Sequence, residues 1–347
     1  MKEMKIVLED GSFWSGTGHG GFASGEVVFT TASSGYPQAI SDPSFAGQII
    51  VFAFPMVGNY GVDECFLESG RPWARAVLAG AVEAGDYLGP RLEEWLAGYD
   101  IPLVTGVDTR SLVRHIRTKG ALQGTVAPSG ETPVFGMTST HPVEEVSIKA
   151  PELMDGPGKT IAVIDYGLKQ GIQRELLKRG CRVVRLPHNS SKEDILSWHP
   201  DGILLGNGPG DPSALVKETE VVSLLLKEVP IGGICLGLQI IALACGASTY
   251  KLPFGHRGEN HAVIDLRSGR GLVTSQNHGY AVSESSLKGT GLEVTHRNLS
   301  DGSVEGVRSP GGEVLAIQYH PEGSPGPADG EVFFEEFLSM CERSSAR

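Results

Sequence analysis

The sequence predicts an α/β protein with an N-terminal mixed β/α domain and a C-terminal domain built on a doubly wound, mainly parallel sheet. The first observation is the alternation of short apolar segments with helical segments and glycine-containing turns over residues 160–246. This alternation is typical of parallel strands joined by helices that cover both faces of a sheet. The second is the length of 347 residues, which suffices for two domains with hydrophobic cores.

The first 140 residues are rich in predicted strands. KIVLEDGSFW, GEVVFTT and FAGQIIVFAFPMVGNYG have strand composition with breaks at glycine or proline. DTRSLVRHIRTKG is different, because Leu112, Val113 and Ile116 recur at helical spacing. Asp108 can cap this helix and Gly120 can end it. We therefore predict a strand-rich domain that contains one clear helix.

Residues 141–158 contain three prolines and show no clear period. We predict that they form a linker between a domain at 1–140 and a domain at 159–347.

After the linker, predicted strands and helices alternate. The strands are TIAVIDYG, CRVVRLP, DGILLGNGPG and IGGICLG, and the helices between and after them are LKQGIQRELLKRG, SSKEDILSW, DPSALVKETEVVSLLLKEV and LQIIALACG. Ser191 and Asp194 have the spacing of a capping box. Asp211, followed by Pro212, predicts the start of the third helix. The tail beyond 251 is strand-rich and closes with the helix EVFFEEFLSMCE.

Composition limits the classes of partner. The net charge of −12 argues against nucleic acid or an anionic membrane, because phosphate binding needs a basic surface. The N-terminus has only a short apolar run, so we expect no signal peptide. The longest uncharged stretch, Ile231–Tyr250, is interrupted by four glycines, which favours a buried strand and helix over a membrane span. The five scattered cysteines form no CxxC pair, so we expect no metal site and a cytoplasmic location.

Cys235 is a candidate nucleophile because it lies between a predicted strand and a predicted helix. A turn of this kind exposes a nucleophile, and the positive end of the following helix favours a thiolate. Burial as a small hydrophobic residue is the alternative, and it is common for free cysteine. Cys245, ten residues later, lies in the helix beside Gly246, and we predict that it only packs.

A nucleophilic cysteine needs a base, and the base needs an orienting group. His320 can serve as the base and Glu322 as the orienting group. The two residues follow an apolar strand and are two positions apart, so in an extended chain their side chains point to the same side. The turn LLGNGPGDP places Gly208 and Gly210 at the carboxyl end of another strand, where backbone N–H groups can hold an oxyanion.

NGPGDP, GICLGLQ and HPE, in this order, resemble the class I glutamine amidotransferases. In the N-terminal part, LEDG, GEVVFTTASSGYPQAISDPSFAGQI, GNYGV and GVDTRSLVRHIRTKGALQG are similar to the small, glutamine-hydrolysing subunit family of carbamoyl-phosphate synthase. FGHRGENHAV and SQNHGYAV fit the same family, so the resemblance covers nearly the whole chain.

The resemblance implies a flavodoxin-like fold and a catalytic triad. Cys235 would attack the side-chain amide of L-glutamine, His320 would transfer protons, and Glu322 would orient His320. The thioester would be hydrolysed to glutamate. Further implied glutamine and oxyanion contacts are Ser44, Gly208, Gly210, Leu236, Gln239, Asn277, Gly279 and Tyr280.

The resemblance also implies partners. Ammonia would pass through a tunnel to a large subunit, in a heterodimer or higher assembly, that makes carbamoyl phosphate from bicarbonate. ATP and magnesium are expected in that subunit, and no cofactor or metal in this chain. The product would serve pyrimidine or arginine biosynthesis. Two positions depart from the family: Leu238 stands where histidine is frequent, and GENHA carries Glu259 and Ala262 where small and proline residues are usual.

Three alternatives remain open from the sequence. The chain could be the amidotransferase subunit of another synthase, of the anthranilate or guanylate type, although those usually lack the N-terminal domain. It could be a non-catalytic assembly subunit, which the intact triad disfavours. It could be a cysteine peptidase. Gln239 and NGPGDP favour glutamine as the substrate, but they exclude a peptidase less firmly than the other two alternatives are excluded.

Overall fold

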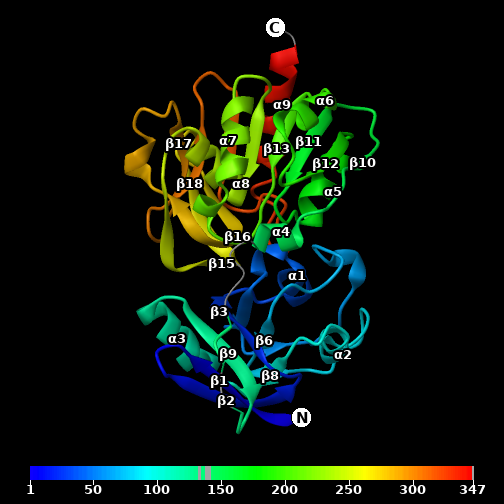
Figure 1. The fold of residues 1–347 in the computed structure, drawn as a ribbon, viewed down its shortest axis with the longest axis vertical. Coiled ribbons are helices and arrows are strands. Elements are labelled where there is room, and N and C mark those ends of the chain that lie inside the picture. The colour runs from blue at the N-terminus through cyan, green and yellow to red at the C-terminus, as the bar shows by residue number, and fades with distance from the viewer. Residues whose placement is uncertain (132–133, 137–141, 346–347) are drawn as a thin grey trace. The chain divides into compact units, whose positions relative to one another are not determined.

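The computed structural model describes residues 1–131, 134–136 and 142–345, and the chain divides into two compact units (Figure 1). The N-terminal unit comprises Met1–Thr140 with Pro253–Gly258. The C-terminal unit comprises His141–Leu252 with Glu259–Arg347. The segment Pro253–Gly258 thus belongs to the N-terminal unit, although it lies far along the sequence inside the range predicted for the second domain.

The strands of the N-terminal unit close into a barrel in the order β1-β2-β8-β6-β4-β3-β9. Their bounds are β1 (Lys2–Leu8), β2 (Phe13–His19), β3 (Ala23–Thr30), β4 (Gln48–Phe52), β6 (Ala76–Leu78), β8 (Leu103–Thr105) and β9 (Leu122–Pro128). β3, β4, β6 and β8 pair in parallel, whereas β1 pairs antiparallel with β2 and β9. A separate pair joins β5 (Met56–Val57) and β7 (Ala81–Val82).

Successive residues of the barrel strands feed two hydrophobic cores. On β3, Val27 and Phe29 pack into the cluster that contains Leu112 and Ile116 of α3 (Thr109–Lys119). Val28, between them, packs into the cluster that includes residues of α1 (Tyr36–Ser41) and α2 (Leu92–Ala97). This alternation is the two-residue period of a strand that is covered on both faces.

The predicted helix α3 is confirmed together with its caps. The side chain of Asp108 accepts a hydrogen bond from the N–H of Ser111 at 3.0 Å. Gly120 follows the last residue with φ 95°.

The C-terminal unit contains a sheet in the order β10-β12-β11-β13-β14-β19-β18-β17-β15-β16. The bounds are β10 (Glu152–Met154), β11 (Thr160–Asp165), β12 (Arg182–Pro187), β13 (Gly202–Leu205), β14 (Ile231–Ile234), β15 (Thr249–Asp265), β16 (Gly271–Val282), β17 (Glu293–Asn298), β18 (Val304–Arg308) and β19 (Val314–Ile317). β12, β11, β13, β14 and β19 are mutually parallel, and the pairs beyond them that involve β10, β17 and β18 are antiparallel. Within the parallel part, β12-β11-β13-β14-β19 is the 2-1-3-4-5 order of a flavodoxin-like sheet, so the predicted fold class is confirmed.

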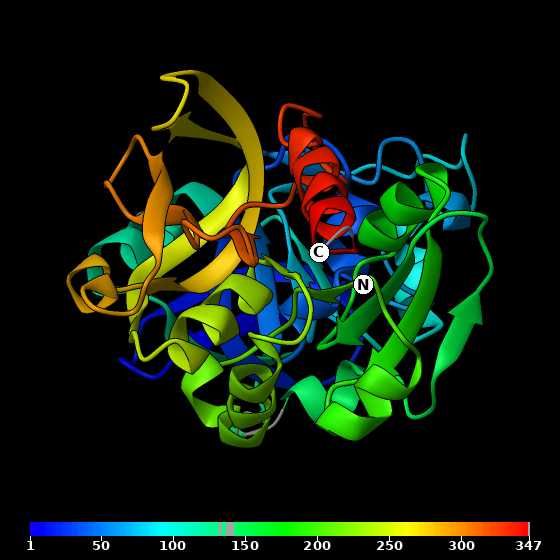
Figure 2. The same ribbon diagram turned by 90° about the horizontal axis from the view of Figure 1, so that it is seen from above.

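Helices cover both faces of this sheet. Their bounds are α4 (Pro142–Val146), α5 (Gln170–Lys178), α6 (Lys192–Ser197), α7 (Val216–Leu225), α8 (Leu236–Ala244) and α9 (Val332–Ser345). Ile164 and Leu205 pack with residues of α6, α7 and α8, whereas Val163 and Leu204 pack with residues of α5 and α9. Figure 2 shows α9, in red, on the opposite side of the sheet from the yellow-green helices α7 and α8. The parallel strands are therefore buried on both faces, as their continuous apolar sequences predict.

Two segments differ from the sequence-based prediction. Asp211 caps only the short 3-10 turn Pro212–Ala214, by accepting from the N–H of Ser213, and α7 begins at Val216. The predicted linker 141–158, whose first residue lies outside the described residues, contains α4 and the edge strand β10. It contains folded elements because β10 pairs with β12, a partner that cannot be read from the linker's own sequence.

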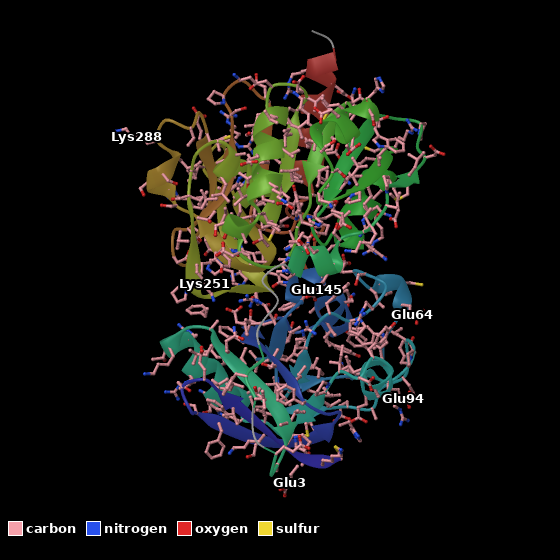
Figure 3. All side chains as sticks on the ribbon, in the orientation of Figure 1. Glu3, Glu64, Glu94, Glu145, Lys251 and Lys288 are labelled. Atoms are coloured by element: carbon pink, nitrogen blue, oxygen red, sulfur yellow. The ribbon has the colours of Figure 1, made fainter. Side chains whose placement is uncertain are left out.

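Many charged side chains lie on the surface of both units. Figure 3 shows this for Glu3, Glu64 and Glu94 in the N-terminal unit, and for Glu145, Lys251 and Lys288 in the C-terminal unit. Among the described helices, none is both long enough and apolar enough to span a bilayer.

Candidate active site

Cys235 occupies a sharp turn between β14 and α8. Its backbone has φ 55° and ψ −105°, and a positive φ is uncommon for a residue other than glycine. Its N–H donates to the carbonyl oxygen of Ile317 on β19 at 2.8 Å, which ties the turn to the neighbouring strand. A strained turn from strand to helix is the arrangement that presents a nucleophile at the edge of a sheet.

Two glycines let α8 begin very close to the sheet. A Cβ atom at Gly237 would lie 2.2 Å from the carbonyl oxygen of Leu205 on β13. A Cβ atom at Gly233 would lie 2.7 Å from the carbonyl carbon of Gly237. A side chain at either position would push the helix away from the strands. The close approach keeps the N-terminal end of α8 beside Cys235, and the N-terminal end of a helix in general favours nearby negative charge.

His320 and Glu322 follow β19 and lie beside each other in the interior. The N–H of His320 donates to the carbonyl oxygen of Ser275 on β16 at 2.8 Å. Nδ1 of His320 lies 2.8 Å from Oε1 of Glu322, and both side chains are almost completely buried. Because Nδ1 faces the carboxylate, Nε2 remains to exchange a proton with the thiol, and it makes no other hydrogen bond within the described residues.

Lys169 extends this constellation, and the sequence-based prediction missed it. The residue follows the carboxyl end of β11 and directly precedes α5. Its Nζ lies 2.7 Å from Oε1 of Glu322, and its side chain is only 2% exposed. Its backbone N–H donates to Oδ1 of Asn207 at 3.0 Å. The signal that could have identified Lys169 is its place after a parallel strand, at the sheet edge that also carries Cys235.

The buried charges control the protonation of the triad. Burial alone would raise the pKa of Glu322, but the Lys169 ammonium and then His320 hold the pKa of this carboxyl well below its usual range. Burial and Lys169 lower the pKa of His320, but the Glu322 carboxylate and the interaction with the Cys235 thiol outweigh them and raise it above its usual value. His320 is therefore suited to hold a proton while the sulfur is negative, which is the state a nucleophilic cysteine requires.

The predicted oxyanion donors lie beside the thiol. A Cβ atom at Gly208 would be 2.2 Å from the carbonyl oxygen of Tyr166 and 2.9 Å from Cδ2 of Leu236, so only glycine fits there. Leu236 is the first residue of α8, where N–H groups have no partner within the helix. Gly210 differs, because it is exposed, has φ 95° and packs against Pro142; its conformation shapes the turn.

Several of the residues predicted to contact glutamine lie near Cys235, on α8 and β16. The carbonyl oxygen of Asn277 lies 3.7 Å from the Cys235 sulfur. The side-chain nitrogen of Gln239 donates to the carbonyl oxygen of Tyr280 at 2.8 Å and to Oε1 of Gln318 at 3.0 Å. Gly279 lies between Asn277 and Tyr280 on β16. These residues lie on α8 and β16, the two elements that hold Cys235 and the carbonyl group next to its sulfur, and their contact with glutamine stays a prediction.

Ser44 belongs to the N-terminal unit. It is buried in the 3-10 turn Pro43–Phe45, and its N–H donates to Oδ1 of Asp42 at 2.8 Å. Its contact with glutamine also stays a prediction.

The other cysteines and Leu238 have structural settings. Cys245 ends α8, is partly buried, and burial raises the pKa of its thiol. Burial also raises the pKa of the thiols of Cys181 and Cys341. Leu238 is fully buried in the hydrophobic core beneath α6, α7 and α8. An apolar residue at position 238 is therefore explained by packing.

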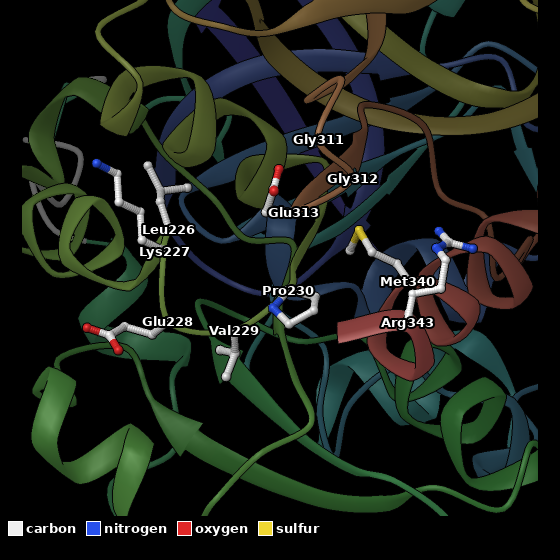
Figure 4. Close-up of a pocket in the computed structure, with 10 residues that line it drawn as sticks. All are labelled: Leu226, Lys227, Glu228, Val229, Pro230, Gly311, Gly312, Glu313, Met340 and Arg343. Carbon is white, nitrogen blue, oxygen red and sulfur yellow. The ribbon is translucent and has the colours of Figure 1, made fainter. Parts of the chain in front are cut away.

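A surface pocket on the same unit lies at the wrong edge of the sheet for catalysis. Figure 4 shows Pro230 and Glu313 among its lining residues. Pro230 directly precedes β14 and Glu313 directly precedes β19, so the pocket lies at the amino ends of these strands. Cys235 follows the carboxyl end of β14. Ligands of doubly wound sheets bind at the carboxyl ends.

Comparison with known proteins agrees with this geometry. Residues 162–340 match the family model "Glutamine amidotransferase class-I", and residues 6–126 match "Carbamoyl-phosphate synthase small chain, CPSase domain". The chain is 45% identical to the carbamoyl phosphate synthase small chain of Bacillus caldolyticus, over 97% of this chain and 96% of that one. It belongs to the carbamoyl-phosphate synthase small chain family. Other members include the small chains of Bacillus cereus, at 43% identity over 97% of this chain and 96% of that one, and of Staphylococcus haemolyticus, at 42% over 96% and 95%.

Proposed function

We propose that this chain is the glutamine-hydrolysing subunit of a carbamoyl-phosphate synthase. The observation that carries the proposal is the buried row Cys235, His320, Glu322 and Lys169 at the carboxyl edge of the parallel sheet. The family match over both units supports the choice of synthase, because residues 6–126 match the small-chain domain.

The proposed reaction uses the sulfur of Cys235 as nucleophile. The thiolate attacks the side-chain carbonyl carbon of glutamine, and the N–H groups of Leu236 and the Gly208 turn hold the oxyanion. His320 then gives its proton to the departing nitrogen, so ammonia leaves and a thioester remains. Water, deprotonated by His320, hydrolyses the thioester to glutamate and restores the thiol. Splitting amide hydrolysis in this way replaces one difficult step by two easier ones.

Lys169 has a supporting role in this scheme. It touches neither the sulfur nor the imidazole in the contacts described, but its Nζ binds the Glu322 oxygen that orients His320. Its positive charge keeps Glu322 ionised, and the ionised carboxylate in turn keeps His320 protonated while the sulfur attacks.

The ammonia is used by a partner in this proposal. A large subunit receives it through a tunnel and makes carbamoyl phosphate from bicarbonate with ATP and magnesium, for pyrimidine or arginine biosynthesis. A heterodimer or higher assembly in the cytoplasm fits the acidic chain and its five cysteines, for which the structure shows no disulfide among the described residues. An anthranilate- or guanylate-type synthase subunit is disfavoured by the match of residues 6–126.

The test compares two nitrogen sources. The chain is mixed with the large subunit of a carbamoyl-phosphate synthase, and carbamoyl phosphate is measured with glutamine or with an ammonium salt. We expect Cys235→Ser to abolish the glutamine-driven reaction and spare the ammonium-driven one. Glutamine-driven synthesis by Cys235→Ser would remove Cys235 from its role. A wild-type chain that hydrolyses peptides, or that does nothing with glutamine, would support the peptidase or the non-catalytic alternative.

A further inference from the structure

Asp165 is a buried carboxylate at the carboxyl end of β11 that the reaction scheme does not use. Its Oδ1 accepts the N–H groups of Gly167 at 2.8 Å and of Leu168 at 2.7 Å. Its Oδ2 accepts the N–H of Ile148 at 2.8 Å and the guanidinium of Arg185 at 2.9 Å. The side chain has no solvent exposure. Each oxygen thus faces only donors, which is a pattern that a carboxylate satisfies and an amide cannot.

The bonds to Oδ1 close the turn 166–168 that presents Lys169. The turn contains Gly167 with φ 121°, and the next residue is Lys169. From there, the Lys169 backbone binds Asn207 and its Nζ binds Glu322. A continuous series of short contacts therefore runs from Arg185 through Asp165 and the turn to Lys169, Glu322 and His320.

The same turn also supports the oxyanion side of the site. The carbonyl oxygen of Tyr166 lies directly against Gly208, where a Cβ atom would approach it to 2.2 Å. Both halves of the catalytic machinery, the triad and the Gly208 turn, thus rest on the segment that Asp165 closes.

We propose that Asp165 is a positioning residue for glutamine hydrolysis, which acts through the 166–168 turn by holding Lys169 against Glu322. The inference rests on the proposed function, because it assigns Asp165 to the same reaction. Arg185 assists by neutralising the buried charge and fixing Oδ2, with Nη1 also 3.4 Å from Glu152. Charge-assisted hydrogen bonds of this kind are stronger and more directional than neutral ones.

Asp165→Asn is the variant that tests the role. The amide keeps the size of the side chain but turns one acceptor into a donor that faces donors. We expect kcat for glutamine-driven carbamoyl phosphate synthesis to fall by about tenfold or more, as for residues coupled in one hydrogen-bond network. We expect KM for glutamine to change little and the ammonium-driven reaction of the complex to stay at the wild-type rate.

Asp201→Asn is the matched control. Asp201 lies at the amino edge of the same sheet, where Oδ2 accepts the N–H of Thr160 at 2.9 Å and Oδ1 lies 3.4 Å from Nζ of Lys159. The Asp201→Asn variant also loses a carboxylate that accepts a backbone N–H group, but at the opposite edge of the sheet from the reacting atoms. Its glutamine-driven kcat should therefore remain at the wild-type level. An equal fall in kcat for Asp165→Asn and Asp201→Asn would overturn the proposal.

A double-mutant cycle with Lys169→Met separates positioning from general stability. If Asp165 acts through Lys169, then Asp165→Asn should lower kcat by less than about twofold when Lys169 is already methionine. Multiplicative losses in kcat would overturn the proposal. Should Asp165→Asn fail to assemble, the cycle is run with Arg185→Met, which removes the guanidinium that fixes Oδ2 and neutralises the Asp165 charge, and the same two outcomes decide. Failure of the proposed function is distinct, because then the wild-type complex itself would not use glutamine.

Discussion

The two ends of α8 carry the same kind of residue in opposite roles. At the N-terminal end, Cys235 has φ 55° and contacts β16 and β19 through Asn277 and Ile317. At the C-terminal end, Cys245 has φ −85° and ψ 0°, and burial raises the pKa of its thiol. The N-terminal end of a helix in general favours a nearby negative charge, whereas burial disfavours ionisation of the Cys245 thiol.

The difference shows that the neighbouring groups, and not the residue type, distinguish the candidate nucleophile Cys235 from Cys245. The helix that follows Cys235 aims its N–H groups at the site, and His320 arrives from β19. At Cys245, the nearest feature is Gly246, whose φ of 91° ends the helix. In this fold, a cysteine at a helix terminus therefore indicates a nucleophile only when that terminus lies at the carboxyl edge of the parallel strands.

The largest effect should come from removing the charge that orients the base at the N-terminal end. We expect Glu322→Gln to lower glutamine-driven kcat roughly a thousandfold or more, as loss of the orienting carboxylate does in related triads. The pH profile should also move. Without the Glu322 charge, burial and the Lys169 ammonium lower the pKa of His320, so activity should decline with rising pH at a lower pH than in the wild type.

The measurement is glutamine-driven carbamoyl phosphate synthesis across pH, with the ammonium-driven reaction as the control for assembly. A basic limb at the same pH in the wild type and in Glu322→Gln would contradict the assignment of His320 as the group whose proton is needed.

The second prediction moves the N-terminal end of α8 away from the sheet. In Gly237→Ala, the new methyl group would lie 2.2 Å from the Leu205 carbonyl oxygen, so helix or strand must shift. A displacement of about 1 Å at a reacting group can cost about a hundredfold in rate. We also expect the free energy of unfolding to fall by about 1–3 kcal/mol.

Gly246→Ala is the matched change at the other end of α8. Nothing lies within 4 Å of the added atom, and only the φ of 91° is strained. We expect it to lower the free energy of unfolding by about 1–2 kcal/mol and to leave glutamine-driven kcat unchanged. Equal kcat losses in both variants, measured beside thermal unfolding, would mean that the closeness of α8 to β13 has no special role at Cys235.

The smallest effect should come from Cys245→Ser. The side chain packs at the margin of the core, so we expect a change in unfolding free energy within about 1 kcal/mol. Glutamine-driven kcat should stay within about twofold of the wild type, because none of the described interactions joins Cys245 to the triad. A strong loss of kcat would break the contrast between the two cysteines.

Much of the C-terminal fold could be predicted because its signals are local. Ser191 and Asp194 form the capping box that their spacing predicts, and the strand-helix alternation predicts the parallel sheet, whereas its flavodoxin-like 2-1-3-4-5 order is implied only by the family resemblance. Asp211 misled the prediction because an Asp-Pro pair caps a 3-10 turn as well as an α-helix, and the chain makes a 3-10 turn before α7 starts at Val216.

The remaining features depend on residues distant in sequence. Closure of the barrel requires β1 to pair with β9, and this pairing cannot be predicted from the sequence of either strand alone. Lys169 was missed because lysine at the start of a helix usually faces water, and its burial follows from a contact with Glu322, 153 positions away. Leu238 was visible as a departure from the family, but only the core packing of α8 explains it.

The central claim is that Cys235 carries the glutamyl group during the reaction. The direct measurement is to mix the assembled enzyme with glutamine, quench it with acid within the first turnover, and identify the modified peptide by mass spectrometry. A glutamyl thioester on the peptide that contains Cys235, and an unmodified Cys245, is the predicted result. Turnover of glutamine with no adduct on Cys235, or with the adduct on another cysteine, would contradict the account.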